Sequence, residues 1–312
     1  MQSAASIAAS PSATIDVKPS ASEVPLRVAV FVIAIVLWIL FIVSVVGLVY
    51  GLILGLVFFF AHLMLIAHVR GSSIKLGPQQ MPELHDRAIR IAHRIGMTRV
   101  PDVYLLQSGG ILNAFATRFG RRRFVVLYSD LVRACGDNLD ALDFIIAHEL
   151  GHIHRGHLNW RWLLAPGLIV PFLGTAYSRA CEYTCDRYGF QASSDKNRSL
   201  DGLCILAAGP QFAPQVNRQA FVAQRDDLNT AFMKLGQWFA THPPLVKRVA
   251  ALVPGLQADG GGSFGATVGA VAMALVLFAL PVVGGAWVIK AAINDMQKSI
   301  GRASGSTDTF RR

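Results

Sequence analysis

The stretch NLDALDFIIAHELGHIHR, residues 138–155, carries the most informative pattern in this chain of 312 residues. Its apolar residues recur at helical spacing, so it predicts an α-helix over 138–155. His148 and His152 stand four residues apart and therefore project from one face of that helix. Two imidazoles on one face can bind a single zinc ion. With Glu149 beside them, they complete the pattern H-E-x-x-H.

This pattern indicates hydrolytic chemistry at a metal. The glutamate carboxylate reaches a water molecule at the metal rather than the metal itself, takes the proton of that water during attack on a carbonyl, and returns it to the leaving amine. We therefore predict His148 and His152 as ligands of one zinc ion per chain and Glu149 as the general base. The alternative is a chance pentapeptide on an amphipathic helix.

A catalytic zinc site needs a third protein ligand. His154 points to another helix face, and His157 comes one residue too early for the elongated pattern H-E-x-x-H-x-x-G-x-x-H, so we interpret both as surface groups or as groups behind the ligands. Glu182 and Asp186 are four residues apart, so one helix could supply a zinc ligand and an acceptor for the outer ring N–H of a ligand histidine. Spacing alone fits a solvated acidic face with arginine partners equally well.

Together these residues resemble the HtpX-type membrane metallopeptidases and the related CAAX prenyl endopeptidases, over roughly residues 75–253. Those families are gluzincins, in which a His-Glu-x-x-His helix is followed by a Glu-x-x-x-Asp helix. The resemblance implies Glu182 as the third zinc ligand, Asp186 as the partner of a ligand histidine, and a mainly helical, zincin-like α+β domain. Cys185 departs from the family pattern, which has a small residue before the aspartate.

Two further segments look like family motifs. Asn113-Ala114-Phe115-Ala116 is similar to the N-A-F-A strand, which borders the cleft and pairs with the substrate backbone. Thr241-His242-Pro243-Pro244, followed by Arg248, is similar to the T-H-P-P-x-x-x-R element. By that likeness His242 would stabilise the developing oxyanion, and Arg248 would hold the region of Glu182 and Asp186 in place.

The composition indicates a membrane protein. Hydrophobic residues make up 53% of the chain, above the roughly 45–50% of soluble domains. Residues 28–69 contain no charged side chain, about twice the length that crosses a bilayer once, and predict two spans at 26–46 and 50–69 around a turn at 47–51. A third span is predicted at 263–290.

These segments divide the chain into regions. We expect a disordered tail at 1–25, a transmembrane hairpin at 26–69, a peptidase domain at 70–262, and a basic tail at 291–312 after the last span. Within the domain, 162–177 is apolar but short and interrupted by proline and glycine, so we favour an interfacial segment over another span.

Secondary-structure patterns in the domain predict an amphipathic helix at 81–95 and strands at 101–106, 114–117 and 124–128. The last two strands flank a turn in the manner of a hairpin. The fold class expected is therefore α+β, mainly helical, with a small antiparallel sheet and transmembrane helices.

Charge and cysteine usage narrow the partners. Lys and Arg outnumber Asp and Glu by 29 to 19, but no nucleic-acid fingerprint accompanies this excess, so lipid headgroups and not nucleic acid are the expected partners. The four cysteines lack paired spacing, which favours reduced thiols. Cys181 and Cys185 would share a helix face, where we favour packing over a zinc or redox role.

We therefore expect a membrane-anchored zinc endopeptidase that cleaves proteins in or near the membrane. The resemblance implies misfolded membrane proteins as substrates. We also expect a multi-pass protein of the bacterial inner (plasma) membrane with the catalytic domain on the cytoplasmic side, which the reduced cysteines favour. The alternative is a catalytically inactive zinc-binding scaffold or chaperone-like protein of the same fold. The intact Glu149 argues against that alternative, since a scaffold needs no general base.

Overall fold

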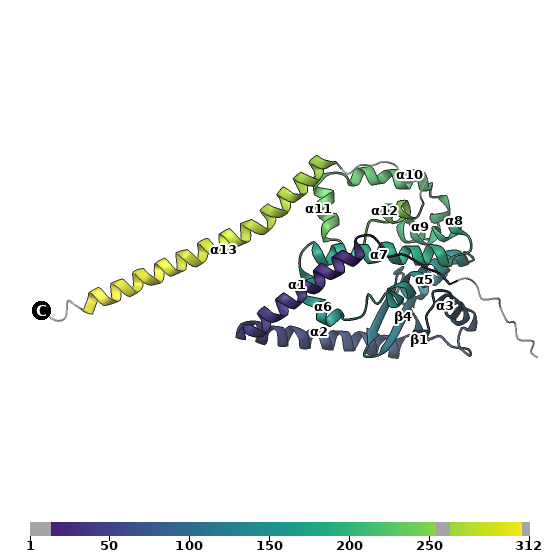
Figure 1. Cartoon of the computed structure of the whole chain (residues 1–312), viewed down its shortest axis with the longest axis horizontal. Helices are drawn as coiled ribbons and strands as arrows, with labels where there is room; N and C mark the ends of the chain where they lie inside the picture. Colours follow the sequence, from purple (N-terminus) through teal and green to yellow (C-terminus); the bar gives the residue numbers. More distant parts are fainter. Residues whose placement is uncertain (1–13, 254–262, 308–312) are drawn as a thin grey trace, which may run out of the picture. The chain divides into compact units, whose positions relative to one another are not determined.

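The computed structural model describes residues 14–253 and 263–307. These are mainly helical, and their strands form a four-stranded sheet (Figure 1). The described residues form two compact units. The first comprises residues 14–225 and 238–253, and the second comprises residues 226–237 and 263–307.

The sheet is mixed. Its order is β1-β2-β4-β3, with β1 at Ile74–Lys75, β2 at Asp102–Leu106, β3 at Ala114–Phe119 and β4 at Arg122–Tyr128. The pair β3 and β4 is antiparallel, as the predicted hairpin requires, but β2 and β4 are parallel. The expectation of an antiparallel sheet is therefore wrong, because the chain after β2 crosses to the outer edge and forms β3 before β4 fills the gap.

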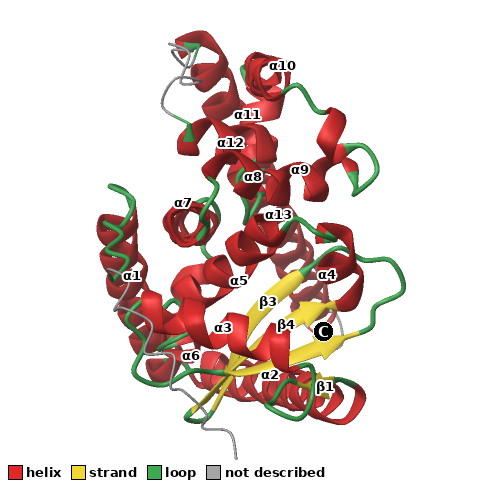
Figure 2. Cartoon of the chain, turned by 90° about the vertical axis from the view of Figure 1, so that its right-hand side faces the viewer, coloured by secondary structure: helices red, strands yellow, loops and turns green. Residues whose placement is uncertain are grey.

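Helices cover both faces of the sheet (Figure 2). On one face, strand residues pack in the core shared with α3 (Pro82–Arg94) and α5 (Leu139–His154), and on the other they pack against the C-terminal half of α2 (Val45–Ser72). Alternate residues of β4 serve the two faces, as the strand period of two demands. Val125 and Leu127 belong to the first core, and Phe124 and Val126 belong to the second.

The two apolar helices α1 (Glu23–Val43) and α2 form a hairpin whose turn lies at Ser44. Ser44 adopts an extended backbone and its hydroxyl accepts a hydrogen bond from Gly47 N at 3.1 Å, which caps α2. The turn predicted at 47–51 is therefore wrong, since Gly47 and Gly51 continue the helix.

Three helices of the described residues are long and apolar enough to cross a membrane: α1, α2 and residues 264–297 of α13 (Phe264–Thr307). Only 11–12% of each apolar window is buried within the protein. Such large exposed apolar surfaces suit a lipid environment. Helix α13 runs through Pro281 and past the predicted end of the span at 290, so the expected basic tail begins as helix.

The N-terminal segment also differs from expectation. Residues 1–13 lie outside the described residues, but 14–22 follow the domain surface and α1 starts at Glu23. Ile15 N donates to Arg94 O at 2.7 Å, and Val17 is 3% exposed. A disordered tail is therefore wrong for 14–25, because Ile15 and Val17 supply apolar side chains to the main core.

The predicted interfacial segment 162–177 is divided between two helices. Helix α6 (Arg161–Ile169) ends before a break at 170–172, and α7 (Leu173–Ala192) follows. At nine residues, α6 is too short to span a bilayer. The remaining helices are α4 at Ser129–Cys135, α8 at Lys196–Ser199, α9 at Asp201–Ala208, η1 at Ala213–Gln215, α10 at Arg218–Ala223, η2 at Gln224–Leu228, α11 at Ala231–Phe239 and α12 at Leu245–Leu252.

Helices α5 and α7 pack closely through small residues. A Cβ atom at Gly189 of α7 would lie 2.7 Å from the carbonyl oxygen of Phe144 on α5. A Cβ at Gly151 of α5 would lie 3.2 Å from the Tyr188 ring. Glycine at these two positions therefore permits a helix separation that larger residues would prevent.

We predict that Gly189→Ala destabilises the fold by about 1–3 kcal/mol, because the backbone of α5 must move to admit the methyl group. Thermal unfolding in detergent micelles measures the loss. The control is Gly236→Ala on α11, where a Cβ meets no atom within 4 Å and alanine raises helix propensity. A Gly189→Ala variant as stable as the unaltered chain would contradict the close approach.

Candidate metal centre

Helix α5 presents the histidines of the H-E-x-x-H pattern toward α7. The helix starts after Asn138, whose side-chain oxygen accepts a hydrogen bond from Ala141 N at 3.1 Å, as an N-cap residue does. His148 and Glu149 are buried, and His152 is partly buried. The sequence-predicted helix at 138–155 and the helical placement of Glu182 and Asp186 on α7 are both present.

Three side chains converge between these helices. His148 Nε2 lies 3.3 Å from His152 Nε2, and the two oxygens of Glu182 lie 3.5 Å from His148 Nε2 and 3.3 Å from His152 Nε2. Ligand atoms about 2.0–2.1 Å from a tetrahedral zinc ion lie about 3.3–3.4 Å from one another. The three groups therefore have the spacing, the chemistry and the burial that a zinc ion requires.

The opposite side of the His148 ring is held by an acidic and a basic residue. Its Nδ1 lies 3.0 Å from Asp186 Oδ1, and Arg248 of α12 donates to both oxygens of Asp186 at 2.5 and 2.8 Å. Arg248 Nη1 also lies 3.5 Å from Glu182. With its proton on Nδ1, His148 directs the free Nε2 lone pair at the other two groups.

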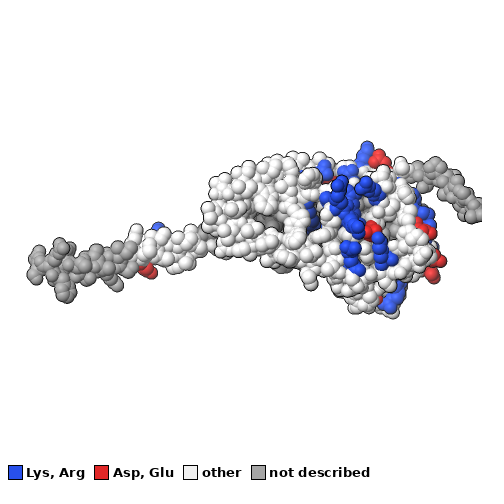
Figure 3. All heavy atoms as spheres, turned by 90° about the horizontal axis from the view of Figure 1, so that it is seen from below, with Lys and Arg blue, Asp and Glu red and all other residues white. Residues whose placement is uncertain are grey.

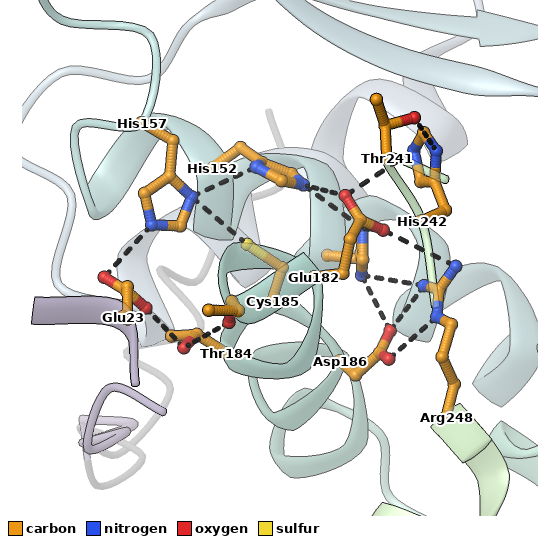
Figure 4. Close-up of polar contacts among 12 residues, drawn as sticks. Glu23, His152, His157, Glu182, Thr184, Cys185, Asp186, Thr241, His242 and Arg248 are labelled. Carbon is orange, nitrogen blue, oxygen red and sulfur yellow. Dashed lines mark hydrogen bonds and ion pairs between the residues drawn. The ribbon is translucent and has the colours of Figure 1, made fainter. Parts of the chain in front are cut away.

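His152 is held in a similar way by His157, which the sequence allowed as a group behind the ligands, and through it by Glu23, which the sequence did not link to the site. His152 Nδ1 lies 3.1 Å from His157 Nδ1, and His157 Nε2 lies 3.3 Å from Glu23 Oε1 (Figure 4). His157 therefore lies behind a candidate ligand. His154 contacts the ring of Tyr188 instead, with ring centroids 5.7 Å apart. Glu23 had no signal beyond being an acid at the start of an apolar helix.

A cleft of about 100 Å³ opens beside the three groups. Its lining includes Glu149, His242 and Arg248, and also Asn113 and Ala114 at the start of β3. The Phe115 side chain instead packs edge-on against Tyr128, with centroids 6.1 Å apart, so its side chain belongs to the core.

The segment that carries His242 is fastened to α7. Arg179 donates to the carbonyl oxygens of Ala240 at 2.6 Å and Trp238 at 3.1 Å, and Thr175 donates to the latter at 2.5 Å. His242 Nε2 lies 3.6 Å from Glu182 Oε1, and its side chain is 66% exposed. His242 therefore lies at the open side of the cluster, facing the cleft.

The electrostatics favour a bound cation. Burial alone would lower the pKa of His148, but hydrogen bonds to Asp186 and Glu182 raise it to about 10 from 6.5. Burial alone would raise the pKa of Glu182, but the two histidines hold it well below its usual value. Without a metal, the cluster thus holds a proton on His148 in its place.

We predict that zinc binding to this cluster releases protons and strengthens with pH. The raised pKa of His148 means that its proton is retained at pH 7 and must leave before Nε2 can bind metal. The apparent Kd for zinc should fall about tenfold per pH unit between pH 6.5 and 8, with about one proton released per ion. Chelator competition and proton-release titration measure both quantities. A Kd independent of pH would contradict the assignment of His148.

Two comparisons with known proteins, one with family profiles and one with individual sequences, point to the same family. The sequence profile of peptidase family M48 matches residues 78–169 and 162–254, together more than half of the chain. Plastoglobule-localized metallopeptidase 48 of Arabidopsis thaliana is 27% identical over 195 residues, which cover 57% of this chain and 55% of that protein. The chain thus spans about half the length of this plant relative.

Bacterial relatives match over a larger share of their own length. A protease HtpX homolog of Bacillus velezensis is 28% identical over 212 residues, covering 54% of this chain and 69% of that protein. Another protease HtpX homolog, of Gemmatimonas aurantiaca, is 26% identical over 215 residues, which cover 56% of this chain and 76% of that protein. No solved structure matches the chain.

Proposed function

The chain belongs to peptidase family M48, and on that premise we propose that it is a membrane-anchored, zinc-dependent endopeptidase with a zincin-like domain. The observation that carries the proposal is the set of 3.3–3.5 Å separations among His148, His152 and Glu182. Glu149 lines the adjoining cleft and is 9% exposed. The cluster and the adjoining cleft thus supply metal ligands, a base and an opening through which a substrate group could reach them.

Each residue has a separate task in the proposed mechanism. A zinc ion held by His148, His152 and Glu182 would supply a Lewis acid that acidifies water and polarises the substrate carbonyl. Glu149 takes the proton of the attacking water and delivers it to the leaving amine. His242 donates a hydrogen bond to the carbonyl oxygen as negative charge develops there. Asp186 and Arg248 keep His148 and Glu182 in place.

Substrate would bind along the free edge of the sheet. Tyr128 N donates to Asn113 O, and Ala114 pairs with Leu127. In an antiparallel ladder the hydrogen-bonded pairs alternate, so Ala114 and Ala116 direct their backbone N–H and C=O groups away from β4. We infer that an extended peptide adds to β3 at these two residues, as in β-augmentation. It would displace the side-chain oxygen of Asn113, which accepts a hydrogen bond from Ala114 N at 2.9 Å.

The edge is closed further along. The carbonyl of Arg118, which also points outward, accepts a hydrogen bond from His62 Nε2 of α2 at 2.8 Å. The open part of β3 therefore ends before Arg118, and the substrate would lie over the cleft end of the strand.

The membrane would bring substrates to this edge. Helices α1 and α2 supply an apolar hairpin, α6 would lie at the interface, and Lys and Arg side chains gather on the domain (Figure 3), where anionic headgroups would be attracted. Substrates would then be membrane or membrane-proximal proteins, including misfolded ones. The four cysteines are free and buried, which is compatible with the cytoplasmic side of a bacterial inner membrane.

We predict that Ala116→Pro lowers kcat/KM about two- to tenfold and leaves zinc content unchanged. Proline removes one outward N–H, and one hydrogen bond contributes about 0.5–1.5 kcal/mol. Thr117→Pro is the control. Thr117 lies opposite Phe124 of β4, and by the same alternation its N–H points into the ladder, so its replacement should also destabilise the sheet. Unaltered kcat/KM in a folded Ala116→Pro variant would contradict substrate pairing at this edge.

We predict that Glu149→Gln retains zinc but loses cleavage by about 10²–10⁴-fold, since the isosteric amide cannot accept the water proton. Glu182→Ala should instead lose zinc. Metal analysis and cleavage of a denatured membrane protein in detergent micelles separate the two effects. Equal cleavage by Glu149→Gln and the unaltered chain would reject the mechanism, and one bound zinc without cleavage in the unaltered chain would favour the inactive scaffold.

A further inference from the structure

The carboxylate at the head of the first apolar helix is buried in an unusual place. Glu23 is the first residue of α1, and its side chain is fully buried. A buried carboxylate is costly unless its oxygens are paired. Its Oε2 accepts a hydrogen bond from the Thr184 hydroxyl at 2.5 Å, and Ser20 N donates to that hydroxyl at 2.9 Å. The start of α1 is therefore fastened to α7, between the positions of Glu182 and Asp186.

The other oxygen of Glu23 points toward the metal centre. Oε1 lies 3.3 Å from Nε2 of His157, whose side chain is 5% exposed, and the Nδ1 of that ring lies 3.1 Å from His152 Nδ1 (Figure 4). His152 Nε2 faces His148 and Glu182. Three side chains thus form an unbroken line of polar contacts from the head of α1 to a candidate ligand atom.

Only one arrangement of protons suits every contact in this line when His152 binds metal. A neutral imidazole that offers Nε2 to a metal carries its proton on Nδ1. His152 Nδ1–H then donates to His157 Nδ1, which must be unprotonated. The His157 proton therefore lies on Nε2, where the Glu23 carboxylate accepts it.

We propose that Glu23 is a positioning residue for the metal centre, acting through His157 to fix the tautomer and ring orientation of His152. This inference rests on the proposed function, because it needs a metal ion at His148, His152 and Glu182. It gives α1 a task beyond anchoring: docking the head of the first apolar helix completes the support of a ligand on α5.

Two simpler roles compete with this one. Arg155 Nη2 lies 3.6 Å from Glu23 Oε1, so Glu23 could serve only as a buried counterion. Cys185 Sγ lies 3.7 Å from His157 Nδ1, and the thiol with His157 and His152 has spacing that could hold a metal of its own. The first role predicts lost stability with unchanged zinc affinity, and the second predicts a second zinc ion that depends on Cys185.

The test compares Glu23→Gln with the unaltered full-length chain in detergent micelles. Glutamine keeps one acceptor oxygen but loses the negative charge, so it holds the His157 N–H less strongly. The Kd for zinc should rise about tenfold, the lower end of the effect of altering a group behind a ligand. The visible spectrum of the Co²⁺-substituted protein should shift, because the orientation of one imidazole changes. Asp143→Asn is the matched control. It also removes an acid paired with arginine, at 2.6 Å from Arg87, but away from this line, and should change neither readout.

A double-mutant cycle tests whether Glu23 acts on His152 through His157. In a His157→Phe background, Glu23→Gln should add no further loss of zinc affinity, since the connection is already broken. If Glu23→Gln raises the Kd for zinc by the same factor in the unaltered chain and in the His157→Phe background, Glu23 does not act through His157, and the proposal is overturned. If His157→Phe does not fold, the Kd and Co²⁺ spectrum of Glu23→Gln decide alone.

The remaining outcomes also test the proposed role of Glu23. Unchanged Kd and spectrum in Glu23→Gln, with a lower unfolding temperature, would reduce Glu23 to a counterion and overturn the proposal. Two zinc ions in the unaltered chain and one in Cys185→Ser would overturn it in favour of a second metal site. An unaltered chain that binds no zinc would contradict the proposed function itself. If the unaltered chain binds one zinc ion and Glu23→Gln changes neither the Kd nor the Co²⁺ spectrum, only the role of Glu23 is contradicted.

Discussion

The close packing of α5 against α7 is the constraint on which the candidate site depends. Glycine at position 189 allows the approach, since a Cβ there would lie 2.7 Å from the carbonyl oxygen of Phe144. His148 and His152 come from one helix and Glu182 from the other, so their 3.3–3.5 Å separations exist only at this helix spacing. Arg248 then ties α12 to α7 through the buried Asp186. The core and the site are thus one packing arrangement.

Much of this arrangement could be predicted from local patterns in the sequence. The four-residue spacing of His148 with His152 was enough to predict a helix with a ligand face. The spacing of Glu182 with Asp186 fitted a solvated acidic face equally well, and the ligand role of Glu182 came from the resemblance to HtpX-type proteases, a family resemblance that is confirmed. Pairing between distant strands was not encoded in any local pattern. The parallel pairing of β2 with β4 depends on a crossover to the sheet edge, and strand periodicity is the same in parallel and antiparallel sheets.

Contacts between the apolar hairpin and the domain could not be predicted from the sequence either. Hydropathy predicts a span wherever charged residues are missing, but it does not say which part of a helix packs against protein. Ile66 and Val69 of α2 pack under the sheet, and His62 closes the end of β3. Glu23 reads as an ordinary acid before an apolar run, yet it is buried beside His157. The hairpin is therefore part of the domain as well as a membrane anchor.

X-ray absorption at the zinc edge, on the purified full-length chain with one equivalent of zinc, would identify the atoms that bind the metal. If His148, His152 and Glu182 bind the ion, we expect only nitrogen and oxygen neighbours at about 2.0–2.2 Å, with the outer-shell scattering of two imidazoles, and loss of this signal in Glu182→Ala. A sulfur neighbour at about 2.3 Å would place the metal at Cys185 instead. That result, or a spectrum unchanged by Glu182→Ala, would contradict a metal centre formed by α5 and α7.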